Sequence, residues 1–242
     1  MENKYGLQLY SVRDITQENL AGAIEKVAGM GYSYLEFAGF FGHTAEEVCE
    51  MMKNNGVTCS GTHSSWLDLR PSVISETLKF HTKIGNPNYI VPGADLSTLD
   101  KIHEFVSVMN FAQPILAAEG IRLGYHNHSN EFQVQPWGST IHSELERLTG
   151  MEFEIDTYWA FNAGIDPLAV LDRLKDRISV IHLKDGFAGG KGVVLGAGEA
   201  PVAAVHAKAK ELGFTIVVES ETLSPDGLTE ARLCMEYLKT LQ

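Results

Sequence analysis

Ionisable side chains recur at alternate positions near the ends of four short apolar segments in the second half of the sequence. The residues of each pair are separated by a single position, and the pairs are His126 and His128, Glu154 and Asp156, His182 and Lys184, and Glu219 and Glu221. Alternate residues of a strand point to the same face, so each pair would share one side of a sheet. Carboxylates and imidazoles without a thiolate are suitable ligands for Mn²⁺, Mg²⁺, Co²⁺ or Zn²⁺. The pattern therefore predicts a divalent-metal site.

The repetition of this placement distinguishes a site from ordinary polarity at strand ends. Any one of these side chains could be a partnered polar group where a strand ends. The same placement on four consecutive segments is harder to explain in that way, because charged groups that converge inside a barrel are costly unless they are paired or bound to a cation. The other parity of each segment is apolar, as in Ile181 and Leu183, and would face the surrounding helices.

Strand-like and helix-like segments alternate along the chain. The predicted strands cover residues 5–10, 34–38, 57–63, 89–91, 121–128, 153–158, 179–184 and 215–219. Helical periodicity follows each of them, at residues 19–30, 45–55, 72–84, 96–119, 140–148, 167–174, 202–212 and 228–241. Eight such units predict one α/β domain over residues 1–242 with the closed (β/α)₈ TIM-barrel fold. Active sites of this fold lie at the carboxyl ends of the strands, where the ionisable pairs are placed.

An open doubly wound sheet is the alternative architecture. Such sheets usually carry a glycine-rich phosphate-binding fingerprint after an early strand, and none is present here. The glycines of residues 186–198 follow the seventh predicted strand and lack the Lys-Ser/Thr ending of a nucleotide-binding loop. They indicate a mobile active-site loop.

Composition restricts the classes of partner. The formal net charge of −12 repels phosphate backbones and anionic lipids, which argues against nucleic-acid and membrane partners. No apolar run approaches the ~18 residues of a membrane span, and the amino terminus lacks the apolar stretch of a secretory signal. The three cysteines are widely spaced and predict reduced thiols. These features together predict a cytoplasmic protein.

The sequence resembles the xylose isomerase-like TIM-barrel family of sugar (phosphate) isomerases and epimerases over essentially its whole length. The segments that carry the resemblance are residues 7–14, 125–132, 156–159, 181–185, 195–198 and 218–219. The resemblance implies a divalent metal ion and proton abstraction next to a carbonyl of a sugar or sugar derivative, through a metal-stabilised enediolate. Related dehydratases and lyases imply an alternative outcome, in which the enolate expels a leaving group. Homo-oligomers are common among the relatives.

The resemblance also implies a ligand set, which in the family is a glutamate, an aspartate, a histidine and a glutamate on the last four strands. Asp156, His182 and Glu219 match three of these positions. The fifth strand departs from the pattern, because His126 stands where the glutamate is expected. Glu131 in the following loop is the favoured fourth ligand by loop reach, and His126 is the competing candidate.

Two groups on opposite sides of the substrate would move the proton in such a reaction. Glu219 is the candidate for one of them, and His126, His128 or Glu131 would have to act opposite it. Lys184, on the face of the seventh strand that carries the predicted ligand, would either stabilise an oxyanion or pair with a carboxylate of the sixth strand.

Further residues at strand ends are candidates for contact with the sugar, although ordinary polarity or lid packing would also explain them. These candidates are Arg13, Glu36, His63, His126 and Trp159. Two other functional classes remain to be separated from a sugar enzyme. A DNA-repair endonuclease on the same barrel would need a basic face, which the net charge of −12 opposes. A non-catalytic sugar-binding protein is opposed by the intact Asp156, His182 and Glu219 set.

Overall fold

Eight parallel strands form a closed barrel in the computed structural model, which describes residues 4–241 of the chain. In chain order the strands are β1 (Gly6–Gln8), β2 (Tyr34–Phe37), β3 (Thr58–His63), β4 (Asn88–Val91), β5 (Arg122–His126), β6 (Glu152–Asp156), β7 (Val180–Leu183) and β10 (Thr215–Val218). Each strand pairs with its neighbours in the chain order, and β1 pairs with both β2 and β10, which closes the sheet. The predicted (β/α)₈ TIM-barrel fold is confirmed.

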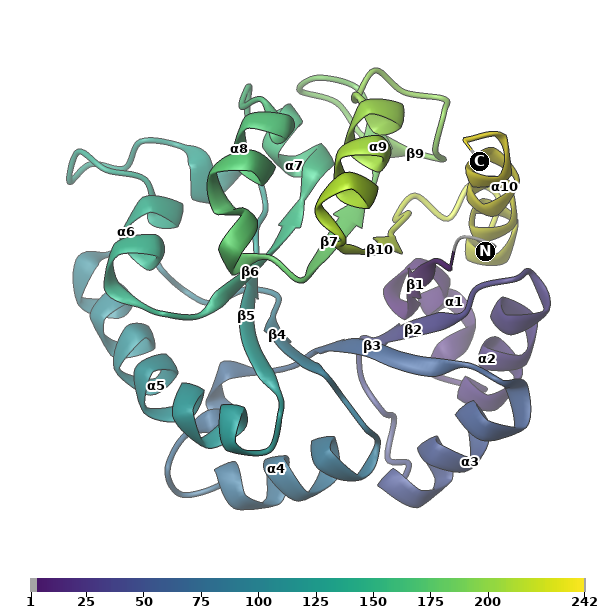
Figure 1. Cartoon of the computed structure of the whole chain (residues 1–242), viewed down its shortest axis with the longest axis horizontal. Helices are drawn as coiled ribbons and strands as arrows, with labels where there is room; N and C mark the ends of the chain where they lie inside the picture. The colour runs from purple at the N-terminus through teal and green to yellow at the C-terminus, as the bar shows by residue number, and fades with distance from the viewer. Residues whose placement is uncertain (1–3, 242) are drawn as a thin grey trace.

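Helices surround the barrel and cover the outer faces of its strands (Figure 1). The α-helices are α1 (Arg13–Thr16), α2 (Leu20–Gly29), α3 (Ala45–Asn55), α4 (Ile74–Lys83), α5 (Leu99–Ala118), α6 (Ile141–Leu148), α7 (Thr157–Asn162), α8 (Pro167–Leu174), α9 (Val202–Leu212) and α10 (Gly227–Thr240). The short 3₁₀ helices are η1 (Leu9–Val12), η2 (Trp66–Leu69), η3 (Asn130–Phe132) and η4 (Lys175–Arg177).

Capping residues explain where the helices begin and end. Thr44 and Glu47 form a reciprocal capping box at the start of α3, and Gly56 ends that helix in the left-handed conformation with φ of 65°. Asp166 caps α8 through its side chain. Pro167 occupies the first helical position, where a backbone N–H would have no acceptor within the helix, so the missing N–H of proline costs no hydrogen bond. Both helices span the predicted residues, 45–55 and 167–174.

Several strands end earlier than predicted, and the changes in β1 and β6 shape the site. β1 stops at Gln8, because the Gln8 side chain accepts a hydrogen bond from the Tyr10 amide (3.0 Å) and begins η1. β6 stops at Asp156, whose carboxylate accepts from the Trp159 amide (2.8 Å) and caps α7. A helix that starts directly at the strand end keeps Trp159 beside the barrel mouth.

The barrel interior is layered from apolar to ionisable. Toward the amino ends of the strands, Ile90, Val180 and Val217 pack as a small buried cluster, separate from the main core between strands and helices. Two positions further along β7 and just beyond β10, the same inward parity carries His182 and Glu219. The layering follows from the period of two along each strand.

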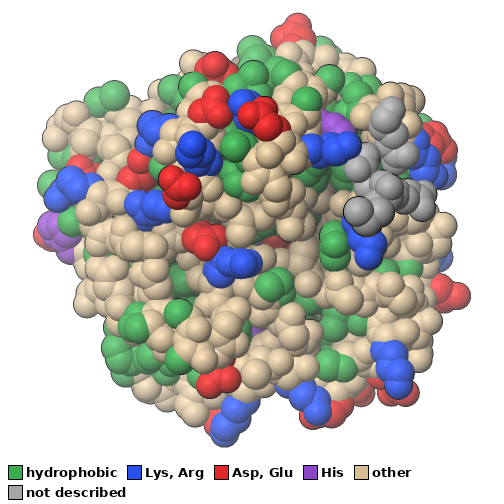
Figure 2. Space-filling view, in the orientation of Figure 1, with side chains coloured by type: hydrophobic (Ala, Val, Ile, Leu, Met, Phe, Trp, Pro, Cys, Tyr) green, Lys and Arg blue, Asp and Glu red, His purple; other side chains and the backbone are tan. Residues whose placement is uncertain are grey.

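On the face of the molecule shown in Figure 2, acidic and basic side chains are interspersed and do not collect into one basic patch. Among the helices of residues 4–241, none is long and apolar enough to cross a membrane.

Burial of His81 in α4 makes stability depend on pH. His81 is only 5% exposed, and burial lowers its pKa to about 4. In the unfolded chain the imidazole titrates near its ordinary value of about 6.5, so below that pH the unfolded state binds the extra proton. This contribution to the free energy of unfolding is complete above about pH 6.5 and is lost as the pH falls toward 4. We expect a loss of about 2–3 kcal/mol between pH 7 and pH 4.5.

Urea denaturation at the two pH values measures this effect. A His81→Asn variant keeps a hydrogen-bond acceptor for the Asn86 side chain, which lies 3.0 Å from His81 Nδ1, but has no titrating ring. The variant should lose about 2–3 kcal/mol less than the natural chain over the same pH interval. Equal losses in the two proteins would show that His81 is not the responsible group.

Candidate metal centre and active site

Four ligand-type side chains converge at the carboxyl end of the barrel. His126, Asp156, His182 and Glu219 place one donor atom each within 4.8 Å of one another. They come from β5, β6, β7 and the residue after β10, and none is more than 3% exposed. Asp156 and His182 are register partners on adjacent strands, which brings their side chains together. The structure thus brings together the three ligands expected from the resemblance, with His126 as the fourth member.

The placement of Glu131 corrects the favoured assignment of the fourth ligand. One Glu131 carboxylate oxygen accepts a hydrogen bond from the Tyr125 hydroxyl (3.0 Å), and the other accepts from the His128 amide (2.9 Å). Glu131 therefore holds the loop that carries His128. It belongs to neither of the donor clusters in the described chain. The same bonds argue against Glu131 as a proton-transfer group.

The donor chemistry of this set fits a divalent cation. Asp156 Oδ2 and His182 Nδ1 are buried polar atoms without a hydrogen-bond partner in the described residues. His182 Nδ1 lies 3.4 Å from Glu219 Oε2, but the two atoms are not aligned for a hydrogen bond. A buried donor or acceptor left unpaired is costly, and a bound cation would satisfy both atoms. The described chain therefore contains a possible His/Asp/Glu metal-binding cluster.

A deeper layer of ionisable residues supports this cluster. Glu36 is fully buried, and its Oε2 lies 2.5 Å from His182 Nε2. The same oxygen accepts a hydrogen bond from the side-chain amide of Gln8 at 2.7 Å. Glu154 Oε2 lies 2.6 Å from His63 Nε2. Glu36, which was expected to contact the substrate, is fully buried and is not among the residues that line the cavity. Glu154 was part of the predicted ionisable pattern, because it shares the inward parity of Asp156, but it was assigned no role of its own.

Burial and charge control protonation in this layer. Burial and the charge of Glu36 raise the pKa of Glu154 to about 7. For Glu36, burial opposes ionisation, but the charges of His182 and His63 outweigh it and lower the pKa to about 2. Burial also disfavours charge on His182, yet the carboxylates of Glu154, Glu36 and Glu219 raise the pKa of its imidazole. Imidazolium and carboxylate groups thus compensate one another in this layer.

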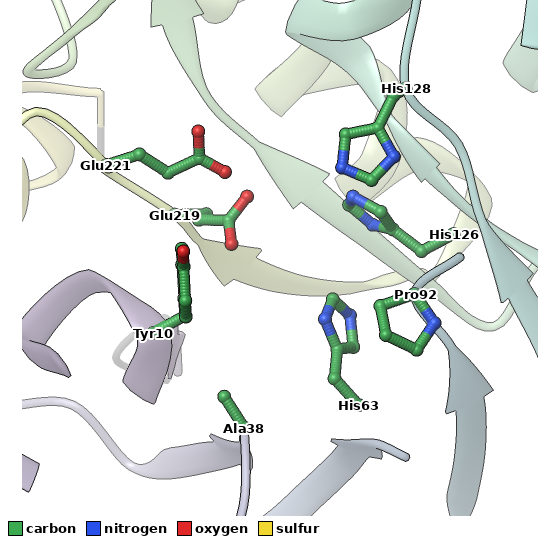
Figure 3. Close-up of a pocket in the computed structure, with 8 residues that line it drawn as sticks. All are labelled: Tyr10, Ala38, His63, Pro92, His126, His128, Glu219 and Glu221. Atoms are coloured by element: carbon green, nitrogen blue, oxygen red, sulfur yellow. The ribbon is translucent and has the colours of Figure 1, made fainter. Parts of the chain in front are cut away.

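A cavity of about 440 Å³ opens above the four-residue cluster, which is a size typical of small-molecule sites. Its lining residues are Tyr10, Ala38, His63, Pro92, His126, His128, Glu219 and Glu221. Figure 3 shows the Glu219 and Glu221 carboxylates on one side and the His126 and His128 rings on the other. A molecule in the cavity would therefore lie between carboxylates and imidazoles.

The two sides of the cavity differ in protonation. Burial opposes charge on Glu219, but Lys184 and His182 hold the pKa of its carboxyl well below the ordinary value. Burial lowers the pKa of His128, which keeps its ring neutral near pH 7. The cavity thus sets an ionised carboxylate opposite a neutral imidazole.

Lys184 is the cation nearest the cavity carboxylates. Its Nζ lies 2.7 Å from Glu221, 3.3 Å from Glu219 and 3.9 Å from Asp156, and its side chain is 1% exposed. The ammonium also lies 4.7 Å from the ring centre of Trp159. Burial disfavours its charge, but the surrounding carboxylates raise the pKa of Lys184, so the ammonium persists. Pairing with a β6 carboxylate, one of the two expected roles, is present with Asp156, but the closest partners follow β10.

The remaining predicted substrate residues lie around this cavity at different depths. His63 lines it directly. Arg13 lies in an adjoining pocket that shares Tyr10 and Ala38 with the main cavity, and its guanidinium donates to the Glu221 carbonyl at 2.7 Å. Trp159 is half-buried and is not among the lining residues. Its ring packs against the ring of His128, which lines the cavity, with ring centres 5.8 Å apart.

Tyr10 and Glu221 line the cavity, but Tyr10 was not predicted, and Glu221 was part of the repeated ionisable pattern without a role of its own. Glu221 shares the face of Glu219 in the sequence, so the period of two was the available signal. Tyr10 had no comparable signal, because its position depends on the turn of η1 after β1.

The glycine-rich segment after β7 contains a short antiparallel hairpin. β8 (Asp185–Gly186) pairs with β9 (Gly192–Val193) in antiparallel fashion. The Asp185 carboxylate accepts hydrogen bonds from the amides of Gly186 (2.8 Å), Gly196 (2.9 Å), Gly198 (3.0 Å) and Ala200 (3.2 Å). A side chain at Gly198 would meet Asp185 Oδ1 at 2.3 Å, so glycine is required there. Asp185 therefore organises the segment that was predicted as a mobile loop.

Replacing Asp185 by alanine should release this segment. We expect the free energy of unfolding to fall by about 2–4 kcal/mol, because several amides lose a charged acceptor. Trypsin should also cleave faster after Lys191, an exposed residue of the hairpin. Urea denaturation and timed proteolysis measure the two effects. Asp172→Ala, which removes a carboxylate paired with Lys208 at the surface, is the control and should change neither; equal cleavage in the two variants would contradict the anchoring role.

Comparison with known proteins defines the class of this barrel. The profile of the xylose isomerase-like TIM barrel family matches residues 24–241, and the chain belongs to this family. No curated protein matches the sequence. A crystal structure of a sugar phosphate isomerase/epimerase from Parabacteroides distasonis ATCC 8503 is 25% identical, with a TM-score of 0.83 over 98% of each chain.

Two more distant structures share the fold. A D-allulose 3-epimerase from Methylomonas sp. is 14% identical with a TM-score of 0.72, over 99% of this chain and 98% of that one. A probable 3-DHS dehydratase from Bacillus anthracis is 11% identical with a TM-score of 0.74, over 98% of this chain and 99% of that one. The neighbouring structures therefore include isomerases, epimerases and a dehydratase.

Proposed function

We propose that this chain is a metal-dependent isomerase or epimerase of a sugar or sugar derivative, which transfers a proton next to a carbonyl group. The convergence of His126, Asp156, His182 and Glu219 beneath a cavity of about 440 Å³ carries the proposal. Family membership and the isomerase and epimerase titles of similar structures support it.

These four residues would hold the cation in the proposed enzyme. Their two carboxylates and two imidazoles suit Mn²⁺, Co²⁺ or Zn²⁺ better than Mg²⁺, which prefers oxygen ligands. When bound, the ion supplies a Lewis acid that polarises a carbonyl or hydroxyl oxygen of the substrate. The unpartnered Asp156 Oδ2 and His182 Nδ1 are the atoms most in need of such a partner.

The side chains of the cavity would move the proton. Glu219 is ionised and faces the cavity, so its carboxylate can accept a proton from the substrate carbon. His128 lies on the opposite side with a neutral ring, which can accept a proton at the other face of the same carbon and, once protonated, return it. The Lys184 ammonium, held by Glu219 and Glu221, adds positive charge where oxygen becomes negative.

Deuterium exchange tests the proposal directly. Purified protein loaded with Mn²⁺ is incubated in D₂O with a panel of ketoses and ketose phosphates, and mass spectrometry follows deuterium in the recovered sugar. We expect incorporation at one carbon next to the carbonyl for at least one substrate. An unsaturated product without incorporation would instead establish the elimination that the dehydratase relatives suggest.

Metal analysis is the second arm of this test. The protein should bind about one Mn²⁺ per chain, in keeping with a single four-ligand site. An Asp156→Ala/Glu219→Ala double variant should lose that ion. Unchanged Mn²⁺ content in the double variant, or a metal-loaded protein inert toward the whole panel, would contradict the proposed function.

A further inference from the structure

A second set of donor atoms, termed the deeper set because it contains Glu154, two residues before Asp156 on β6, adjoins the proposed metal site. His63 Nε2, His126 Nδ1 and His182 Nε2 lie 2.6, 3.1 and 3.2 Å from the same atom, Glu154 Oε2. All four donor atoms lie within 4.8 Å of one another. The proton transfer proposed above uses neither His63 nor Glu154.

The imidazole rings are arranged as ligands around one point. The ring centres of His63, His126 and His182 are 4.9, 5.2 and 4.7 Å apart, so the three rings form a nearly equilateral triangle. In a tetrahedral zinc site with ligand distances of about 2.0–2.1 Å, neighbouring ligand atoms are about 3.3 Å apart. Two of the three nitrogen-to-oxygen distances to Glu154 are close to that separation.

We propose that His63, His126, Glu154 and His182 form a deeper binding site for a transition-metal ion of the zinc class, alternative to the upper set. Three nitrogen donors and one oxygen donor favour Zn²⁺ or Co²⁺ over Mn²⁺ and Mg²⁺. Glu36 supplies a second negative charge, since its Oε2 lies 2.5 Å from His182 Nε2 and 3.4 Å from His63 Nε2. One divalent cation among neutral imidazoles would balance the two buried carboxylates.

The upper and deeper sets share His126 and His182, so they compete for one ion. A neutral imidazole has a single nitrogen lone pair and carries hydrogen on the other nitrogen. His182 directs Nε2 to the deeper set, while its Nδ1 faces Glu219 of the upper set. Each ring can therefore serve one set at a time. This inference rests on the proposed function only in treating the upper set as a metal site.

Lys184 adds a reason for the two sets to prefer different ions. Its ammonium lies 3.3 Å from Glu219 and 3.9 Å from Asp156, the two carboxylates of the upper set. Neither His63 nor Glu154 forms an ion pair with a lysine or arginine in the described chain. The upper set thus has a lysine ammonium beside it, which lowers its attraction for a metal cation, whereas the deeper set has no lysine or arginine beside it in the described chain.

Zn²⁺ binding by matched variants tests the proposal. Zn²⁺ affinity is measured for the chelator-treated full chain by competition with a chromophoric chelator, and Co²⁺ is titrated by visible absorption. His63→Gln removes a ligand of the deeper set alone, and Asp156→Asn removes one of the upper set alone. We expect His63→Gln to weaken Zn²⁺ binding by more than about 100-fold, beyond the loss typical of an outer-shell change. Asp156→Asn should weaken it less than about 10-fold.

Glu154→Gln is a second variant of the deeper set and should weaken Zn²⁺ binding as His63→Gln does. Circular dichroism and the urea midpoint establish that each variant is folded. The deeper site is overturned if Asp156→Asn weakens Zn²⁺ binding and His63→Gln does not. It is also overturned if the natural chain does not bind Zn²⁺. If Mn²⁺-supported deuterium exchange persists in that case, the proposed function stands. If Zn²⁺ binding follows His63 but no Mn²⁺-supported exchange occurs, the deeper site stands and the proposed function fails.

Discussion

Replacing Glu219 by glutamine is expected to lower the rate of deuterium exchange into the substrate by about 10²–10⁴-fold. Glutamine has nearly the shape of glutamate, but its amide cannot accept a proton from carbon. Glu219 is the group best suited to this role, because it lines the cavity and Lys184 and His182 keep it ionised. The Mn²⁺ content of each preparation is measured alongside, so that loss of the ion is separated from loss of the base.

Glu221→Gln is the matched control for this prediction. Glu221 lies two residues further on, lines the same cavity and is closer to the same lysine, at 2.7 Å. It belongs to neither donor cluster of the described chain. Its replacement should lower exchange by less than about 10-fold, below the range typical of a lost acid–base group. Metal-loaded Glu219→Gln protein that retains more than a tenth of the natural exchange rate would exclude Glu219 as the base.

Replacing Lys184 by methionine is expected to lower the free energy of unfolding by about 3–5 kcal/mol in chelator-treated protein. Methionine fills most of the volume but leaves the buried carboxylates of Glu219 and Asp156 without their cation. Added Mn²⁺ should then stabilise the variant more than the natural chain, because the ion replaces the missing positive charge. Urea denaturation with and without Mn²⁺ measures both effects.

Lys208→Met provides the comparison for this second prediction. Lys208 also lies between two carboxylates, Asp172 and Glu211, each 3.2 Å away, but those partners are 58% and 65% exposed. Surface ion pairs contribute little, so the loss should be below about 1 kcal/mol. Similar losses for the two variants would mean that Lys184 does not compensate buried charge.

The sequence was sufficient for the architecture and for most of the upper ligand set. Strands with a period of two, each followed by a helical pattern, indicate a closed parallel barrel. In such a barrel, parity assigns Asp156, His182 and Glu219 to the interior, and their position at strand ends assigns them to one rim. The placement of these residues needs only local periodicity and chain order, whereas their selection as ligands from among the inward residues came from the resemblance to the family.

Parity assigns a side chain to a face, but it does not determine its depth or its partner. Glu36 has the inward parity of a cavity residue, yet it is fully buried and pairs with His182, which is 146 positions away. The choice between His126 and Glu131 was likewise decided by tertiary contacts. Glu131 folds back to the Tyr125 hydroxyl and the His128 amide, and this leaves His126 in the cluster.

The sequence by itself thus determined the barrel and the rim that carries the ionisable residues, and its resemblance to the family indicated three of the four proposed ligands. The tertiary structure decided the fourth member, the carboxylates that surround Lys184 and the convergence of three imidazoles on Glu154. The physical reason is that distances across a barrel depend on how strands are staggered and how loops satisfy their own hydrogen bonds. Both are properties of the closed sheet and cannot be deduced from any single strand.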